Sequence, residues 1–383
     1  MNELAKIVAE AGRARASAQT IALATVVSIE GSAYRLPGAR MLIAGGKWVA
    51  GSISGGCLED DVVMRAEEAI KDNQAVVTTY DTTSDDDIVF GVGLGCKGII
   101  TILIEAIGPA GPSVDFIGFA KTCFEGRTTG VVATVVHVQG EVKAKPGSRM
   151  VSRAGASTTD ITDNELKAKL ANVMGKLLPP GASLTTIPLQ HGSAQVFIER
   201  IEPPPPLVVF GAGHDAMPVV HLAKELGWQV TVVDHRPAYA TTARFPLADK
   251  VVVAAPDDVL SHIDVTGDTL ALVMTHNYLR DLKLLEILLP SPVRYIGQLG
   301  PQKRTGQLLD DLRQKGVHPK PEQLARLYAP VGLDIGSESP AEVALSIVSE
   351  MQAVITDHTG GFIRAKRSHI HSRDSAYRIA EVV

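Results

Sequence analysis

Apolar and polar positions follow two periods along the first hundred residues. Apolar side chains recur every three or four positions over residues 3–19 and 58–72, which predicts two amphipathic helices. Short apolar runs bounded by turn residues predict strands. These runs cover residues 20–29, 39–43, 75–80 and 99–106. The first part of the chain is therefore predicted to be a small α/β domain.

A run of prolines at residues 203–206 separates this part from a second pattern. Proline runs form stiff, extended linkers. Behind the linker, short apolar runs alternate with helical stretches, which is typical of a parallel sheet with crossover helices. The runs cover residues 207–210, 229–234, 250–254, 269–274 and 294–296. We expect a last helix over 340–355, with Ser339 as its N-cap and Pro340 as its first residue.

The first half of the chain contains an internal repeat. Ten residues recur 109 positions later, among them those of the motifs Ala24-Thr-Val-Val27 and Pro37-Gly38. The motif Ile104-Glu105 recurs at Ile198-Glu199, so the second copy is shorter by 15 residues. We therefore predict a first copy over 1–110, a degenerate second copy over 111–202, the linker 203–206, a Rossmann-like doubly wound domain over 207–356 and a flexible tail over 357–383.

Composition excludes some classes of protein. The chain has 383 residues, of which 45% are hydrophobic and 21% charged, and its net charge is −5, so no basic field for nucleic acid or an anionic membrane exists. The N-terminus lacks a signal-peptide pattern and no apolar run is long enough for a membrane span, from which we expect a cytoplasmic protein. The three cysteines do not form a disulfide framework, so free thiols are expected.

Two glycine-rich loops of the first copy each carry a cysteine. The stretch from Gly51 to Cys57 leads directly into a predicted helix, whose first N–H groups and partial positive charge suit a phosphate and lower the pKa of a thiol. A second loop, Gly93-Leu-Gly-Cys96, precedes a strand. The two loops indicate a ligand held between two thiols, and the second copy lacks both cysteines. In the alternative interpretation, the glycines only make turns and the cysteines are small core residues.

The second domain begins with a dinucleotide fingerprint. Gly211 would make the turn after the first strand, Gly213 would let the backbone approach a pyrophosphate, and Ala216 would allow close helix packing. Asp234, at the end of the second strand, would bind ribose hydroxyls, although Arg236 could receive a 2′-phosphate. His276 follows a later strand at the ligand-binding edge, where it orients a ligand, transfers a proton or is a hydrogen-bonded structural residue.

Several motifs together resemble those of the XdhC/CoxI family, the xanthine dehydrogenase accessory proteins. They are Gly38-Ala-Arg-Met41, Gly51 to Cys57, Gly93 to Cys96, Gly211-Ala-Gly-His214, Met274-Thr-His-Asn277, Tyr295-Ile-Gly297 and Gly332 to Gly336. The resemblance spans residues 20 to 355. Two positions depart from the family pattern: Lys97 follows Cys96, and His235 replaces a proline after Asp234.

The resemblance implies a maturation factor rather than a turnover enzyme. Such a protein binds and protects the molybdenum cofactor (molybdopterin), supports its sulfuration with a cysteine desulfurase, and delivers it to a xanthine dehydrogenase or CO dehydrogenase-type molybdoenzyme. It implies Cys57 and Cys96 as metal contacts or sulfur carriers, and, with the large apolar fraction, a homodimer. The cofactor-binding residues that we expect are Gly51, Ser52, Ser54, Gly55, Gly56, Cys57, Gly93, Gly95, Cys96, Gly211, Gly213, His214, Asp234 and His276.

Two other classes of function remain open at this point. An NAD(P)-dependent oxidoreductase would use the Rossmann domain, with NAD(P) or another nucleotide as its cofactor, and would leave the cysteine loops unexplained. A scaffolding protein would have lost both sites, against which the intact loops argue. Arg35 and Arg40 are candidate anion contacts, but Arg149 occupies the position equivalent to Arg40 and favours a structural role for it. We expect Cys123 to be a core residue.

Overall fold

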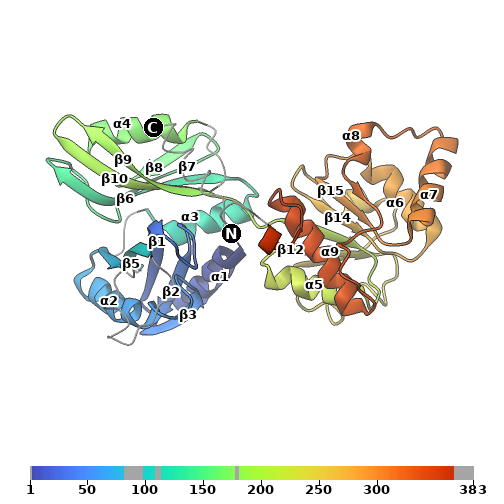
Figure 1. Cartoon of the computed structure of the whole chain (residues 1–383), viewed down its shortest axis with the longest axis horizontal. Coiled ribbons are helices and arrows are strands. Elements are labelled where there is room, and N and C mark those ends of the chain that lie inside the picture. The colour runs from blue at the N-terminus through green and yellow to red at the C-terminus, as the bar shows by residue number, and fades with distance from the viewer. Residues whose placement is uncertain (1, 82–97, 108–113, 177–180, 366–383) are drawn as a thin grey trace. The chain divides into compact units, whose positions relative to one another are not determined.

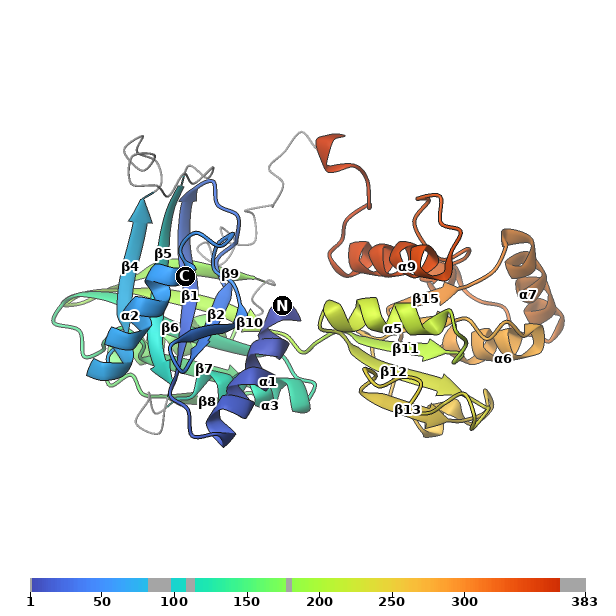
Figure 2. The same cartoon turned by 90° about the horizontal axis from the view of Figure 1, so that it is seen from below.

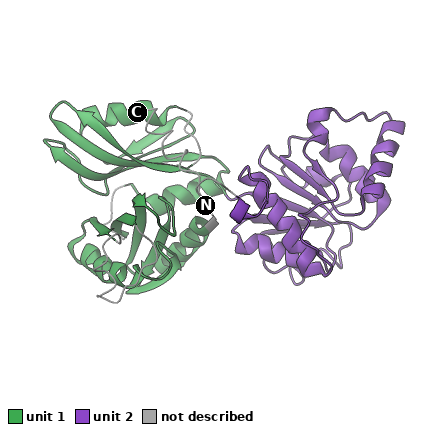
Figure 3. Ribbon diagram, viewed as in Figure 1, with its two compact units in different colours: residues 1–203, 368–383 green, residues 204–367 purple. Residues whose placement is uncertain are grey.

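The computed structural model describes residues 2–81, 98–107, 114–176 and 181–365 (Figure 1). Two compact units divide these residues between Pro203 and Pro204 (Figure 3). The boundary lies within the predicted linker, and the last proline of that linker, Pro206, already begins a strand. Residues 366–383 of the predicted tail lie outside the described residues.

The first copy of the repeat forms an antiparallel sheet with two helices. Its strand order is β3-β2-β1-β5-β4. The elements are α1 (Asn2–Ala16), β1 (Ile21–Gly31), β2 (Arg40–Ala44), β3 (Lys47–Gly51), α2 (Glu59–Asp72), β4 (Val76–Asp81) and β5 (Gly98–Ile107). Helix α1 ends before the predicted residue 19 because Ala18 adopts a left-handed backbone conformation, with φ of 54°.

The second copy forms a second antiparallel sheet of the same order, β8-β7-β6-β10-β9. Its elements are α3 (Phe116–Glu125), β6 (Gly130–Gly140), β7 (Arg149–Arg153), β8 (Ala156–Thr159), α4 (Asn164–Met174), β9 (Ala182–Leu189) and β10 (Gly192–Ile201). Each strand and helix therefore has a counterpart in the first copy, and the positions that repeat in the sequence occupy the same places in the two sheets.

The two sheets share a core. Successive residues of β1 point to opposite faces, which is why this strand is buried over seven consecutive positions. Ala22 and Ala24 pack toward α2, whereas Ile21 and Leu23 pack into a cluster that contains α1, α3 and residues of the second copy. Buried Cys123 belongs to this shared cluster, which agrees with its predicted place in a core.

Two buried ion pairs join the copies reciprocally. Arg40 of β2 binds Glu199 of β10, and Arg149 of β7 binds Glu105 of β5. All four side chains are at most 7% exposed. The ring of Phe116 lies 4.2 Å from the Arg40 guanidinium carbon and 6.0 Å from that of Arg149. Arg40 is therefore a structural residue, as its equivalence to Arg149 predicts, and Arg35 is paired with Glu3.

The second unit is a parallel sheet with helices on both faces. Its strand order is β13-β12-β11-β14-β15-β16, the order of a classical dinucleotide-binding domain. The strands are β11 (Pro206–Phe210), β12 (Gln229–Asp234), β13 (Lys250–Val253), β14 (Leu270–Val273), β15 (Tyr295–Gln298) and β16 (Leu327–Tyr328). The predicted Rossmann-like fold is confirmed.

Helices α5 and α9 cover one face of this sheet, and α6 and α7 cover the other (Figure 2). The helices are α5 (Ala216–Glu225), α6 (Tyr278–Leu288), α7 (Gln302–Gln314), α8 (Pro321–Leu324) and α9 (Pro340–Ile355), with short 3-10 turns η2 (Val259–Ser261) and η3 (Ile363–Ala365). Helix α9 has the predicted bounds, with Ser339 as its N-cap. None of the helices in the described ranges combines the length and apolar character needed to cross a membrane.

Candidate functional site

The loop between β3 and α2 presents Cys57 to solvent. The thiol is exposed, and α2 begins two residues later at Glu59. Ser54 lies buried beneath the loop, and its hydroxyl oxygen accepts hydrogen bonds from the N–H groups of Gly56 at 3.2 Å, Cys57 at 3.1 Å and Leu58 at 3.2 Å. One serine therefore sets the backbone course that exposes the thiol.

The carboxylate of Glu59 turns back into the same loop. It accepts hydrogen bonds from the N–H groups of Ser54 at 2.9 Å and Leu58 at 3.2 Å and from the Ser54 hydroxyl. Burial alone would raise the pKa of Glu59, but these hydrogen bonds hold it below its ordinary value. The loop N–H groups of Ser54, Gly56, Cys57 and Leu58 are thus already occupied by the protein's own oxygens.

The role of Glu59 was not predicted from the sequence. A signal exists, because a serine five residues ahead of a first-turn acid, across a glycine pair, can form such a closed loop. Most of the polar groups in the expected anion-binding loop therefore bond to one another.

The glycines of the loop serve two different purposes. Gly51 has φ of 73°, and a side-chain carbon there would lie 2.1 Å from the carbonyl oxygen of Arg40, so β2 requires this glycine. Gly56 has φ of 109°, and no atom lies within 4 Å of the place of its missing side chain. Gly51 is thus a requirement of the fold, whereas Gly55 and Gly56 lie exposed at the surface beside Cys57.

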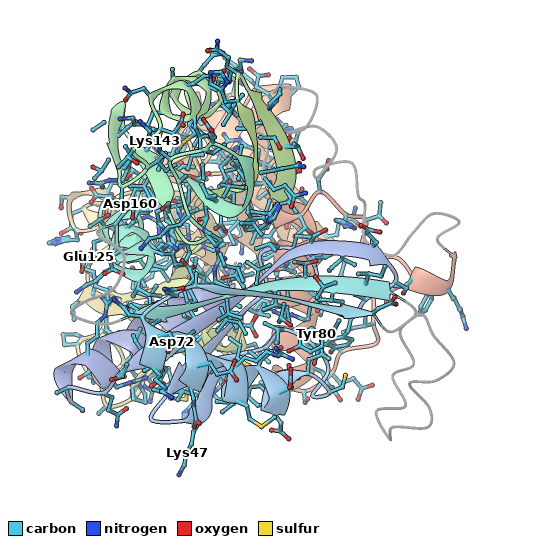
Figure 4. All side chains as sticks on the ribbon, turned by 90° about the vertical axis from the view of Figure 1, so that its left-hand side faces the viewer. Lys47, Asp72, Tyr80, Glu125, Lys143 and Asp160 are labelled. Carbon is cyan, nitrogen blue, oxygen red and sulfur yellow. The ribbon has the colours of Figure 1, made fainter. Side chains whose placement is uncertain are left out.

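A surface depression lies against this loop. Its lining includes Lys6, Tyr34, Trp48, Ser52 and the loop glycines. Tyr34 is 67% and Trp48 50% exposed, although large aromatic side chains are usually buried. The indole N–H of Trp48 donates to the Gly51 carbonyl, which orients the ring. At the start of β3, the side chain of Lys47 points away from the ribbon (Figure 4). The depression therefore offers two exposed aromatic side chains and the ammonium group of Lys6, together with the carboxylate of Glu3.

Gly93, Gly95 and Cys96 lie outside the described residues, so the expectation of two facing thiols stays a prediction. Within the ranges that the structure describes, no three His, Cys, Asp or Glu side chains cluster as metal ligands.

The glycine turn of the second unit has the expected form. Gly211 has φ of 119°, and a side-chain carbon there would lie 2.4 Å from the carbonyl oxygen of Met274, so the approach of β14 requires a glycine. Ala216 is fully buried at the start of α5. Beside Gly213, however, a side-chain carbon would lie 2.4 Å from an Asp215 carboxylate oxygen. A carboxylate thus faces the turn where a pyrophosphate was expected.

Asp234 does not offer the free acceptor that a ribose needs. Its oxygens accept hydrogen bonds from the N–H of Ala212 at 2.8 Å and, at 2.8 to 2.9 Å, from the backbone and guanidinium of Arg236, and His235 Nδ1 lies 3.0 Å away. Burial opposes ionisation, but the bonds from Arg236 and Ala212 lower the pKa of Asp234 to about 2. The ribose role assigned from the fingerprint is therefore not supported by the geometry.

His276 forms a pair with Asp215 above the glycine turn. Its Nε2 lies 2.7 Å from Asp215 Oδ2, and the residue adopts a left-handed conformation, with φ of 55°. The His276 side chain is 60% exposed, and His214 is also exposed. Neither histidine is a buried core residue. The pair lies at the carboxyl edge of the sheet, where an imidazole held by a carboxylate can orient a ligand or exchange a proton.

Comparisons with known proteins cover both sites. The model of the XdhC and CoxI family matches residues 14–81, which include the Cys57 loop, and the model of the XdhC Rossmann domain matches residues 207–351. A Bacillus subtilis protein named as a probable xanthine dehydrogenase subunit is 34% identical over 329 residues, 86% of this chain and 91% of that protein.

The chain is also similar to a second protein sequence and to a solved structure. The uncharacterized protein YqeB of Escherichia coli is 30% identical over 236 residues, which are 61% of this chain and 42% of that protein. A crystal structure described as a xanthine dehydrogenase from Bacillus halodurans has the same fold, with a TM-score of 0.73 and 26% identity over 98% of this chain and 99% of that chain.

Proposed function

Because this chain belongs to the XdhC and CoxI family, we propose that it is a maturation factor for a xanthine dehydrogenase-type molybdoenzyme. The observation that carries the proposal is the exposed thiol of Cys57, which directly follows Gly56 in the lining of a depression with two exposed aromatic side chains. A loop held by Ser54 and Glu59 presents this thiol, so its exposure follows from the fold.

The ligand that we propose for this site is the molybdenum cofactor, and the residues present fit it in part. A planar pterin suits the open faces of Tyr34 and Trp48. A soft thiolate such as that of Cys57 suits a thiophilic metal. The cofactor's phosphate would bind Lys6, because the loop N–H groups of Ser54, Gly56, Cys57 and Leu58 are occupied. When bound, the cofactor would supply a molybdenum centre able to exchange an oxo for a sulfido ligand.

In this proposal the chain protects the cofactor while the cofactor is sulfurated, and then delivers it. The sulfur donor would be a cysteine desulfurase, and the recipient a xanthine dehydrogenase or CO dehydrogenase-type enzyme. An exposed thiol, rather than an enclosed one, suits a site that has to be reached by two partner proteins in turn.

The test is the molybdenum and pterin content of the protein, expressed in cells that make the cofactor and purified without oxygen. We expect measurable loading of the unmodified chain and a loss of loading in Cys57→Ala and in Cys96→Ala. Cys123→Ala is the matched control, because Cys123 is fully buried and is not among the residues that line the depression, and it should load normally. Negligible loading of the unmodified chain, or equal loading of all variants, would contradict the proposal.

A further inference from the structure

A pocket at the carboxyl edge of the second unit has two chemically different walls. It opens beside the ends of β12 and β14, where the adenosine half of a dinucleotide binds in domains of this strand order. One wall is apolar and includes Val233, Ala254 and Leu284, and the other carries Asp234, Arg236 and Arg280. An apolar slot beside a charged rim suits a nucleobase attached to a phosphorylated ribose.

The only carboxylate among the lining residues is already satisfied. Asp234 accepts four hydrogen bonds, three of them from Arg236, at 2.8 to 2.9 Å. Arg236 is itself held in place by the ring of Tyr239, whose centroid lies 3.8 Å from the guanidinium carbon. Ribose hydroxyls would have to displace this arrangement to reach the carboxylate, at a cost in binding free energy.

The rim has positive charge in excess. Arg236 is neutralised by Asp234, whereas the guanidinium of Arg280 makes no hydrogen bond, ion pair or ring contact with any of the described residues. Burial and then the charges of Arg280 and Arg236 lower the pKa of His235, which lines the same pocket. The pocket thus contains the Arg280 guanidinium, which has no anionic partner among the described residues, and His235, whose pKa burial and then this charge lower. A bound phosphate would supply the missing anion.

We propose that this pocket binds the adenosine end of a ligand whose ribose carries a 2′-phosphate, as in NADPH, and that Arg280 recognises this phosphate while Arg236 keeps Asp234 away from the ribose hydroxyls. The proposal concerns the second unit only and does not rest on the maturation role of the first. The two proposals can fail separately, because the maturation role is tested by the molybdenum content of the chain and its Cys57 variant, whereas this inference is tested by nucleotide affinity.

The test compares NADPH with NADH by isothermal titration calorimetry on the full chain. We expect NADPH to bind at least about tenfold more tightly, the amount that one charge-assisted contact provides. In Arg280→Ala, the affinity for NADPH should fall to that for NADH, with the affinity for NADH unchanged. In Arg236→Ala, the released Asp234 carboxylate should bind ribose hydroxyls and shift the preference toward NADH.

Arg313→Ala is the matched control, because Arg313 is exposed on α7, outside this pocket, and pairs with Asp310. It should leave both affinities unchanged. Inorganic phosphate at equal ionic strength should not displace NADPH, since the apolar wall contributes as well. Equal binding of both nucleotides, tighter binding of NADH, no binding of either at millimolar concentration, or unaltered preference in Arg280→Ala would each overturn the inference.

Discussion

The carboxylate of Glu59, together with the Ser54 hydroxyl, holds the loop that presents Cys57. We expect Glu59→Gln to lower the free energy of unfolding of the first unit by about 1–3 kcal/mol. An amide nitrogen would then face N–H groups that donate hydrogen bonds to the carboxylate in the unmodified chain. Urea unfolding of the variant and the unmodified chain measures this difference. Asp60→Asn is the matched control, because Asp60 is exposed in the same helical turn.

The effect of Glu59→Gln should depend on pH. The pKa of Glu59 lies below its ordinary value of 4.5, so its stabilisation is complete above that pH and is lost as the pH falls through the lowered value. The stability difference between the variant and the unmodified chain should therefore shrink on acidification from pH 7. A difference that stays constant, or grows toward low pH, would show that the carboxylate charge does not hold the loop.

Gly51 tests whether a loop glycine serves the fold or a ligand. Gly51→Ala places a carbon 2.1 Å from the Arg40 carbonyl oxygen, whereas Gly45→Ala meets no atom within 4 Å at a similarly positive φ. Both variants carry left-handed strain of about 1–2 kcal/mol, and only Gly51→Ala adds overpacking of about 1–3 kcal/mol. Thermal unfolding should therefore give a lower midpoint for Gly51→Ala than for Gly45→Ala. Equal midpoints would mean that β2 shifts to accommodate the added carbon without loss of stability.

At the scale of elements, the reciprocal ion pairs hold the two sheets to each other. Arg149→Met leaves Glu105 buried without its partner and should cost about 3–5 kcal/mol, whereas adding Glu105→Leu should restore most of the loss. Burial raises the pKa of Glu105 even beside Arg149, and more so in the single variant. The loss should therefore grow as the pH rises above the ordinary carboxyl pKa of 4.5.

Chemical unfolding of the first unit across pH measures both effects. The equivalent pair Arg40→Met and Glu199→Leu provides an internal replicate, because the same contact occurs there with the copies exchanged. If the single variants were as stable as the double ones, the pairs would not contribute to the contact between the sheets.

The elements that could be predicted are those with strong local signals. Helix α9 begins and ends as expected because Ser339 caps it and Pro340 starts it. Strand β16 and helix α8 were not predicted, because two-residue and four-residue elements have no period to detect. The roles of Glu59 and Arg236 were also missed or left open, because they depend on which donors the fold brings to one carboxylate. Local patterns do not contain this information.

At the scale of the whole molecule, the proline run separates two units that each have their own core. We expect residues 1–203 and 204–383, expressed separately, to fold and to unfold cooperatively, each at the temperature of one transition of the full chain. Differential scanning calorimetry of the three proteins tests this. A segment without a cooperative transition would show that its unit depends on the other.

The organisation into a repeat, a linker and a Rossmann-like part was accessible from sequence because each part has a pattern longer than one element. The matched strand orders of the two antiparallel sheets agree with the repeat that the ten identities indicate. The hydrogen-bond partners of the site residues were harder to predict from the sequence. Asp234 has the sequence position of a ribose acceptor, yet its carboxylate is paired with the guanidinium of Arg236, and only the fold shows this contact.

The reciprocal contacts of Arg40 and Arg149 also imply a history. In a twofold symmetric pair, a residue of one protomer meets a residue of the other, and the same contact recurs with the protomers exchanged. A half-length ancestor with one such arginine and one such glutamate would have made both ion pairs with a second copy of itself. Duplication and fusion of such a half would enclose that association in a single chain, in which the cysteines of one half could be lost without disturbing the shared core.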